Sequence, residues 1–104
     1  MDQELKLNTW VLLGNTLNAV LRGPQQVALA DEELRVRLLA LEATLAPVTP
    51  EGMVDAVQAL TVSDRMLLHD LCVACFDRLG EEAATLVGVD RATGEPVLAL
   101  LQGR

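Results

Sequence analysis

The sequence predicts a mainly α-helical domain, with a four-helix bundle-like arrangement that is closed by a C-terminal β-hairpin. The chain has 104 residues, which is the length of one domain, so we expect a single domain over residues 1–104. Apolar side chains recur at helical spacing in four segments that turn residues separate. After Gly80 the spacing changes, and two short apolar runs flank a polar segment that contains a glycine.

The first helix is expected over residues 2–22, where Gly23 and Pro24 end it because a proline cannot continue a helix. Its apolar side chains cover two faces rather than one stripe, which indicates a helix that is central or pressed against a second subunit. Gly14 in its interior costs about 1 kcal/mol relative to alanine. Another helix that crosses closely at this position would offset that cost.

The other helices are expected over residues 31–46, 50–60 and 63–79. Each range begins near a side chain that caps helix N-termini. The capping residues are Asp31, Thr49 ahead of Pro50, and either Thr61 or Ser63. Thr61 with Asp64 fits a capping box, and Gly80 is the natural residue after the end of the last helix.

The segment over residues 86–101 is expected to form the β-hairpin. Gly94 would take the positive-φ position of its turn, and Pro96 fits the first residue of an edge strand. A short helix over residues 97–102 is the alternative, because periodicity alone does not separate a strand from a helix in so short a run. An isolated hairpin is marginal in water, so the helices or a second chain would have to cover it.

The charge of the chain disfavours nucleic acids and anionic membranes as partners. Fifteen acidic and eight basic residues give a net charge of −7, the wrong sign for neutralising phosphates. No apolar run approaches the roughly 20 residues that span a bilayer, and the first residues do not look like an export signal. The two cysteines, without a secretory context, indicate a reducing compartment. We therefore expect a soluble, cytoplasmic protein.

His69, Cys72 and Cys75 are the one cluster of metal-capable or redox-capable side chains. On one helix these positions climb about 9 Å and rotate through about 120°, so the three cannot reach one metal ion. The cysteines lie within an apolar stripe, far from the helix N-terminus that would lower a thiol pKa. We expect them to belong to the core and His69 to lie at its edge. A thiol- or metal-dependent sensor or enzyme that uses His69 and Cys72 is the alternative.

The sequence contains no recognisable machinery for acyl or phosphoryl transfer, so we expect no catalysis, no cofactor and no metal. The excess apolar surface of the first helix and of the hairpin favours a protein partner, and two-fold homodimers are the commonest assemblies. We expect a small acidic protein–protein interaction module, such as an adaptor, an assembly chaperone or an inhibitor subunit. The expected interface residues are Trp10, Leu13, Leu17, Val97, Ala99 and Leu101.

The nine residues Leu60 to Leu68, LTVSDRMLL, resemble a segment of phage baseplate and tail-assembly proteins. Any capped amphipathic helix start has a similar string, so we infer no family membership from it. A phage-type assembly protein or a transcription regulator remains a further alternative. A DNA-reading helix would need side chains that reach base edges, whereas Arg65 is the only basic residue in the first two turns here.

Overall fold

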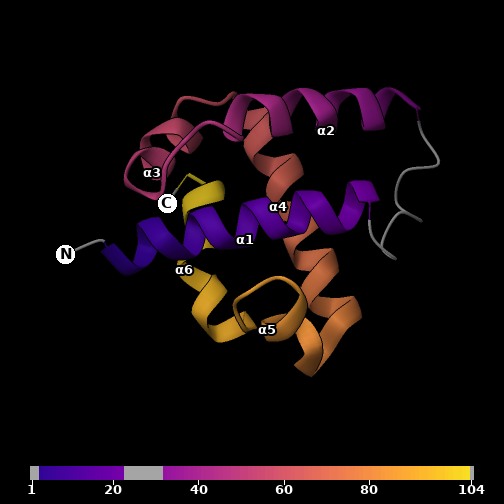
Figure 1. Cartoon of the computed structure of the whole chain (residues 1–104), viewed down its shortest axis with the longest axis vertical. Helices are drawn as coiled ribbons and strands as arrows, with labels where there is room; N and C mark the ends of the chain where they lie inside the picture. Colours follow the sequence, from indigo (N-terminus) through magenta and orange to yellow (C-terminus); the bar gives the residue numbers. More distant parts are fainter. Residues whose placement is uncertain (1–2, 23–31, 104) are drawn as a thin grey trace.

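Helix α1 (Gln3–Arg22) lies at the centre of the fold, and the other helices surround it (Figure 1). The structure is a computed structural model that describes residues 3–22 and 32–103. In Figure 1, α2 passes above α1, α4 crosses behind it, α5 lies below, and α6 runs from below α1 to behind it. The bounds are α2 (Glu32–Leu45), α3 (Pro50–Gln58), α4 (Val62–Leu79), the 3₁₀ turn η2 (Gly80–Glu82), α5 (Ala83–Leu86) and α6 (Arg91–Leu101).

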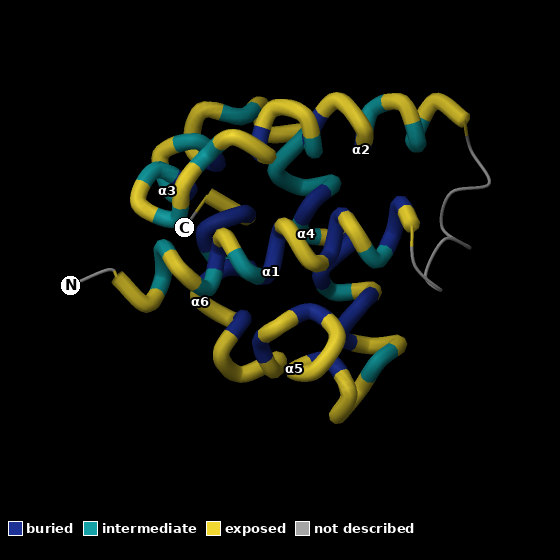
Figure 2. The backbone as a smooth tube through the Cα atoms, in the orientation of Figure 1, coloured by how far each residue is buried: buried dark blue, intermediate teal, exposed yellow. Residues whose placement is uncertain are grey.

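The core lies around α1, where buried side chains of α2, α3, α4 and α6 pack against this helix (Figure 2). Leu12 of α1, Leu68 of α4 and Val97 of α6 are fully buried there. Two buried threonines of α1 keep their hydroxyl groups bonded, since Thr9 donates to the Leu5 carbonyl at 2.6 Å and Thr16 accepts from the Cys72 thiol at 3.8 Å. Only a strip of the outer side of α1, with Leu7, Trp10 and Gly14, is exposed.

The mainly helical prediction is confirmed, because all four segments expected to be helical are helical in the structure. The caps explain their starts. The Thr61 side chain accepts from the Asp64 amide at 3.1 Å, so α4 begins at Val62 rather than after Ser63. Gly80 follows α4 with a φ of 55°. The expected end of α1 at Gly23 and Pro24, and the expected cap Asp31, lie outside the described residues.

The expected β-hairpin over residues 86–101 is wrong, and no residue within 3–22 or 32–103 forms a strand. The Asp90 side chain accepts a hydrogen bond from the Thr93 amide at 2.7 Å and starts α6. Gly94 does not turn the chain at a positive φ; it faces Phe76, where a Cβ atom would lie 2.7 Å from the ring. The glycine of the turn is Gly88, with a φ of 89°. The alternative, a short helix over residues 97–102, begins too late, because the Asp90 cap starts the helix at Arg91.

The four-helix bundle arrangement is also wrong. α4 crosses α1 at a steep angle instead of running alongside it (Figure 1), and α6 packs against both of these helices. The reason is the C-terminal segment. Its buried side chains follow helical spacing, so it packs into the core as a helix against α1 and α4. These buried residues are Gly94, Val97, Leu98, Leu100 and Leu101.

Candidate functional site: a groove along the first helix

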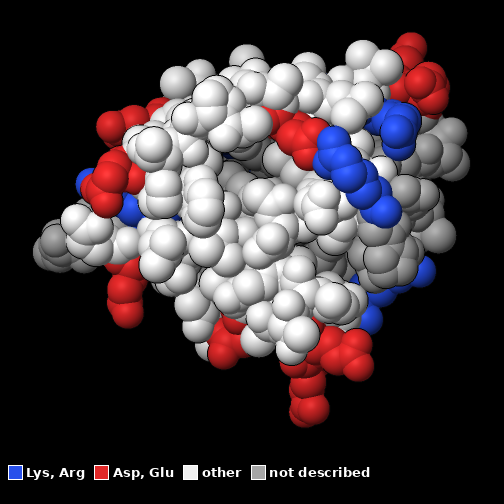
Figure 3. All heavy atoms as spheres, in the orientation of Figure 1, with Lys and Arg blue, Asp and Glu red and all other residues white. Residues whose placement is uncertain are grey.

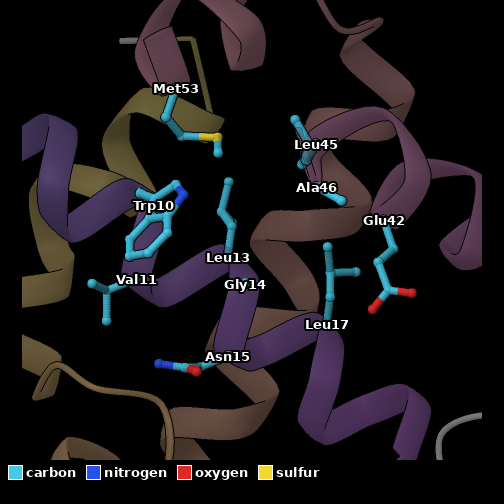
Figure 4. A pocket seen from close by; sticks show the side chains of 10 residues that line it. All are labelled: Trp10, Val11, Leu13, Gly14, Asn15, Leu17, Glu42, Leu45, Ala46 and Met53. Carbon is cyan, nitrogen blue, oxygen red and sulfur yellow. The ribbon is translucent and has the colours of Figure 1, made fainter. Parts of the chain in front are cut away.

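A groove of about 280 Å³ runs along the outer side of α1, towards the end of α2 and the start of α3 (Figure 4). Figure 3 shows this face hollowed near its centre and surrounded mainly by uncharged atoms. Sites for drug-sized ligands usually measure about 300–1,000 Å³, so this groove suits one or two side chains better than a whole small molecule. Its lining residues are Trp10, Val11, Leu13, Gly14, Asn15, Leu17, Glu42, Leu45, Ala46 and Met53.

Trp10 forms one wall of the groove and is held in place by the chain that follows α2. Its indole Nε1 donates a hydrogen bond to the Val48 carbonyl at 3.2 Å, while 41% of the residue stays exposed. A fixed aromatic ring loses little side-chain entropy when a partner packs against it. Tryptophans at the edge of a hollow are typical of the residues that dominate binding energy in protein interfaces.

Gly14 lies in the groove, at an exposed position in the middle of α1 (Figure 4). A Cβ atom added to it would meet nothing within 4 Å in the part of the chain that the structure describes. The helix that was expected to cross closely at Gly14 is therefore not one of the described helices of this chain. A helical glycine costs about 1 kcal/mol relative to alanine, and no described contact within the chain offsets this cost.

The groove carries almost no net charge. The 15 residues from Leu7 to Leu21 include no charged side chain, although the whole chain has a net charge of −7. Glu42 at the edge of the groove is paired with Arg22 through two hydrogen bonds of 2.6 and 2.8 Å. The Arg22 guanidinium lowers the pKa of Glu42 through these hydrogen bonds, so the pair stays ionised and neutralises itself.

The expected interface residues separate into two groups. Trp10, Leu13 and Leu17 all line the groove, although Leu13 is only 1% exposed and supports it from inside the chain. Val97 and Leu101 are buried in the core and Ala99 is half-buried, because residues 97–101 belong to α6. The sequence reasoning missed Val11, Met53 and the open space at Gly14. The long uncharged run in α1 is the signal that points to this face.

His69, Cys72 and Cys75 do not form an exposed reactive site. Cys72 is fully buried against Thr16, and this burial raises the pKa of its thiol to about 12. Burial also raises the pKa of Cys75. His69 places its Nδ1 3.1 Å from a carboxylate oxygen of Asp70 at the surface. Among the described residues, no three His, Cys, Asp or Glu side chains are placed to hold a metal ion.

Both thiols are expected to resist a thiol reagent in the folded protein. Burial holds their pKa above the ordinary value of 9.0, so the folded chain keeps them protonated at a pH where an unfolded chain ionises them. The check is reagent titration at pH 7.5 and pH 9, with and without urea. Two thiols should appear only in urea. A thiol that reacts at once in the native protein at pH 7.5 would favour the sensor or enzyme alternative instead.

Comparison of the chain with protein-family models, with curated proteins and with solved structures finds no match. Within the described residues, no helix has both the length and the apolar character that crossing a membrane requires. The groove of α1 therefore has to be interpreted from its own geometry and chemistry.

Proposed function

We propose that this chain is a small acidic protein–protein interaction module that works without catalysis and pairs with a second copy of itself. The observation that carries the proposal is the exposed, hydrogen-bonded Trp10 beside the open backbone of Gly14. A fixed aromatic wall next to a hollow is the usual form of an interface anchor. An adaptor, an assembly chaperone or an inhibitor subunit would each use a face of this kind.

The polar groups of the groove support a protein partner over a small molecule. Small-molecule and catalytic sites present a few convergent polar groups that orient the ligand. Here the polar side chains of the lining are already engaged within the chain. Asn15 donates to the Val87 carbonyl at 3.2 Å, Trp10 donates to Val48, and Glu42 accepts from Arg22. What the groove offers to a partner is therefore mainly shape and apolar surface.

The absence of charge along the outer side of α1 is the feature of this face that suits a second copy. Two chains that each carry −7 repel one another, and a contact without charged side chains adds no close repulsion to this. The outer side of α1 also presents both halves of a symmetric contact: projecting apolar side chains, with Leu7 50% exposed and Trp10 41% exposed, and the hollow at Gly14. In a two-fold interface the same patch contacts itself, and a patch with a projection and a hollow can be complementary to its own copy.

Light scattering on a size-exclusion column tests the proposal with Gly14→Glu. The wild-type chain is expected at twice its mass of 11.2 kDa, and Gly14→Glu at the mass of one chain. The new side chain has space in the folded chain and favours the helix, but it brings like charges together between two copies. This juxtaposition of like charges costs several kcal/mol, so the dissociation constant of the dimer should rise by about a hundredfold or more.

Ala74→Glu is the matched control, because it adds the same charge at an exposed position of α4 outside the groove. Its mass should equal that of the wild-type chain. A wild-type chain that has the mass of a monomer at every concentration measured would contradict self-association. A Gly14→Glu chain that stays dimeric would show that a different face is used.

A further inference from the structure

We infer that a disulfide between Cys72 and Cys75 and the folded structure exclude each other, so that oxidation by a small disulfide such as oxidised glutathione holds the chain open. In the open form, α4 is unfolded around this pair of cysteines. The pair consists of the two cysteines of the chain, both buried in α4. The inference does not rest on the proposed function, and it makes the fold itself sensitive to the redox state of the surroundings.

The spacing of the two cysteines along α4 is the first argument. They lie three residues apart, and neither is in the first or the last turn of the helix. Residues three apart on a helix hold their Cβ atoms about 5–6 Å apart. A disulfide needs Cβ atoms about 3.5–4.5 Å apart. The intact helix therefore keeps Cys72 and Cys75 about 1 Å too far apart, and the bond requires this turn of α4 to open.

The packing around the pair is the second argument, because it resists any opening of this turn within the fold. Cys72 is 0% exposed, and its thiol donates to the Thr16 hydroxyl of α1 at 3.8 Å. Cys75 is 3% exposed, and the Phe76 ring beside it lies where a Cβ atom of Gly94 in α6 would be. The turn over residues 72–76 is thus packed against both α1 and α6. Closing the disulfide would disturb both contacts.

Burial also keeps the folded chain from reacting, since disulfide exchange requires a thiolate. Burial raises the pKa of Cys72 to about 12 and that of Cys75 above its ordinary value of 9.0. In the open chain both thiols are in water and regain their ordinary pKa. There, one thiolate attacks the small disulfide and releases one small thiol. The second thiolate attacks the mixed disulfide and releases the other, so the chain loses two electrons and two protons and the oxidant gains them.

Urea titration at a series of glutathione ratios, at one fixed protein concentration, tests the exclusion. The relevant ratio is that of glutathione disulfide to the square of the glutathione concentration, because one disulfide is consumed and two thiols are produced. Where the oxidised form dominates the open chain, each tenfold rise in this ratio should lower the ratio of folded to open chain about tenfold. The urea midpoint should therefore fall, and dithiothreitol should restore it in the same sample. A midpoint that stays constant over the series would overturn the inference.

The isolated oxidised chain gives a second measurement. Oxidation in urea and removal of the urea should give a chain that is lighter by two hydrogen atoms and has a far-UV circular dichroism signal well below that of the reduced chain. Dithiothreitol should restore the helical signal. A chain of this lower mass that keeps the circular dichroism and the urea midpoint of the reduced chain would show that the fold accepts the disulfide, and would overturn the exclusion.

The double variant Cys72→Ala with Cys75→Ala is the matched control, because it removes both thiols and keeps good helix formers in α4. Its urea midpoint should be the same at every glutathione ratio, whatever its absolute stability. A midpoint that falls as it does in the wild-type chain would show that glutathione acts elsewhere, and would overturn the inference. Recovery of the wild-type chain in dithiothreitol tests the same point without relying on the variant.

Discussion

Leu13→Asp is expected to leave the chain largely unfolded at pH 7. Leu13 is 1% exposed, so the variant loses a buried apolar side chain and places a carboxylate in the core. Removing a buried leucine side chain costs about 2–5 kcal/mol, and burying an unpaired charge adds several more. A domain of this size is stable by only about 5–15 kcal/mol in total. The two losses together are comparable with the whole stability of the fold.

Far-UV circular dichroism and urea titration measure this effect, at one fixed protein concentration because dimerisation also contributes to stability. Asn18→Asp is the control, since it adds the same charge at an exposed position of the same helix. Its free energy of unfolding should stay within about 0.5 kcal/mol of wild type, apart from any loss of dimerisation. If Leu13→Asp unfolded at the wild-type urea concentration, Leu13 would not belong to the core.

Gly88→Ala is expected to destabilise the chain by about 2–5 kcal/mol, from backbone strain and overpacking together. Gly88 has a φ of 89°, which L side chains rarely adopt. A Cβ atom there would lie 2.3 Å from Cγ1 of Val11 and 2.9 Å from Nδ2 of Asn15. Asn15 donates to the Val87 carbonyl at 3.2 Å, so the substitution pushes the turn away from the helix that holds it.

Urea titration of the double variant Gly88→Ala with Val11→Ala separates the two causes. Removing the Val11 methyl groups should restore the part of the stability that the clash removes, while the backbone strain remains. Gly14→Ala is the opposite control, because its Cβ meets no atom within 4 Å. It should stabilise the monomer by about 1 kcal/mol. If Gly88→Ala cost as much stability in the Val11→Ala background as in wild type, Val11 would not be the obstacle.

Several helix boundaries could be predicted from the sequence because the groups that determine them are close together along the chain. Thr61 bonds to the amide of Asp64, three residues away, and Gly80 directly follows the helix that it ends. Such local hydrogen bonds form in the same way whatever the rest of the fold does. Asp90 with Thr93 is a local signal of the same kind for the start of α6, but the strand-like apolar runs on either side of it favour a hairpin.

Gly94 is one reason why the local sequence of the C-terminal segment predicts a hairpin although the segment is a helix. A glycine in a polar segment is typical of a turn, and local sequence offers no reason to place it inside a helix. The reason is a distant side chain: the Phe76 ring of α4 occupies the space where a Cβ atom of residue 94 would lie. A contact between helices so far apart in the chain is absent from any local pattern.

The sequence by itself determined which side chains share a face of α1, and that this helix has apolar residues on two faces and no charge from Leu7 to Leu21. Only the tertiary structure decided which part of this apolar surface is covered. Helical periodicity orders side chains around one axis, but it does not say where the other helices pack. α4 and α6 pack against α1 on the side of Leu12, α2 and α3 also pack against α1, and only a strip with Leu7, Trp10 and Gly14 stays open.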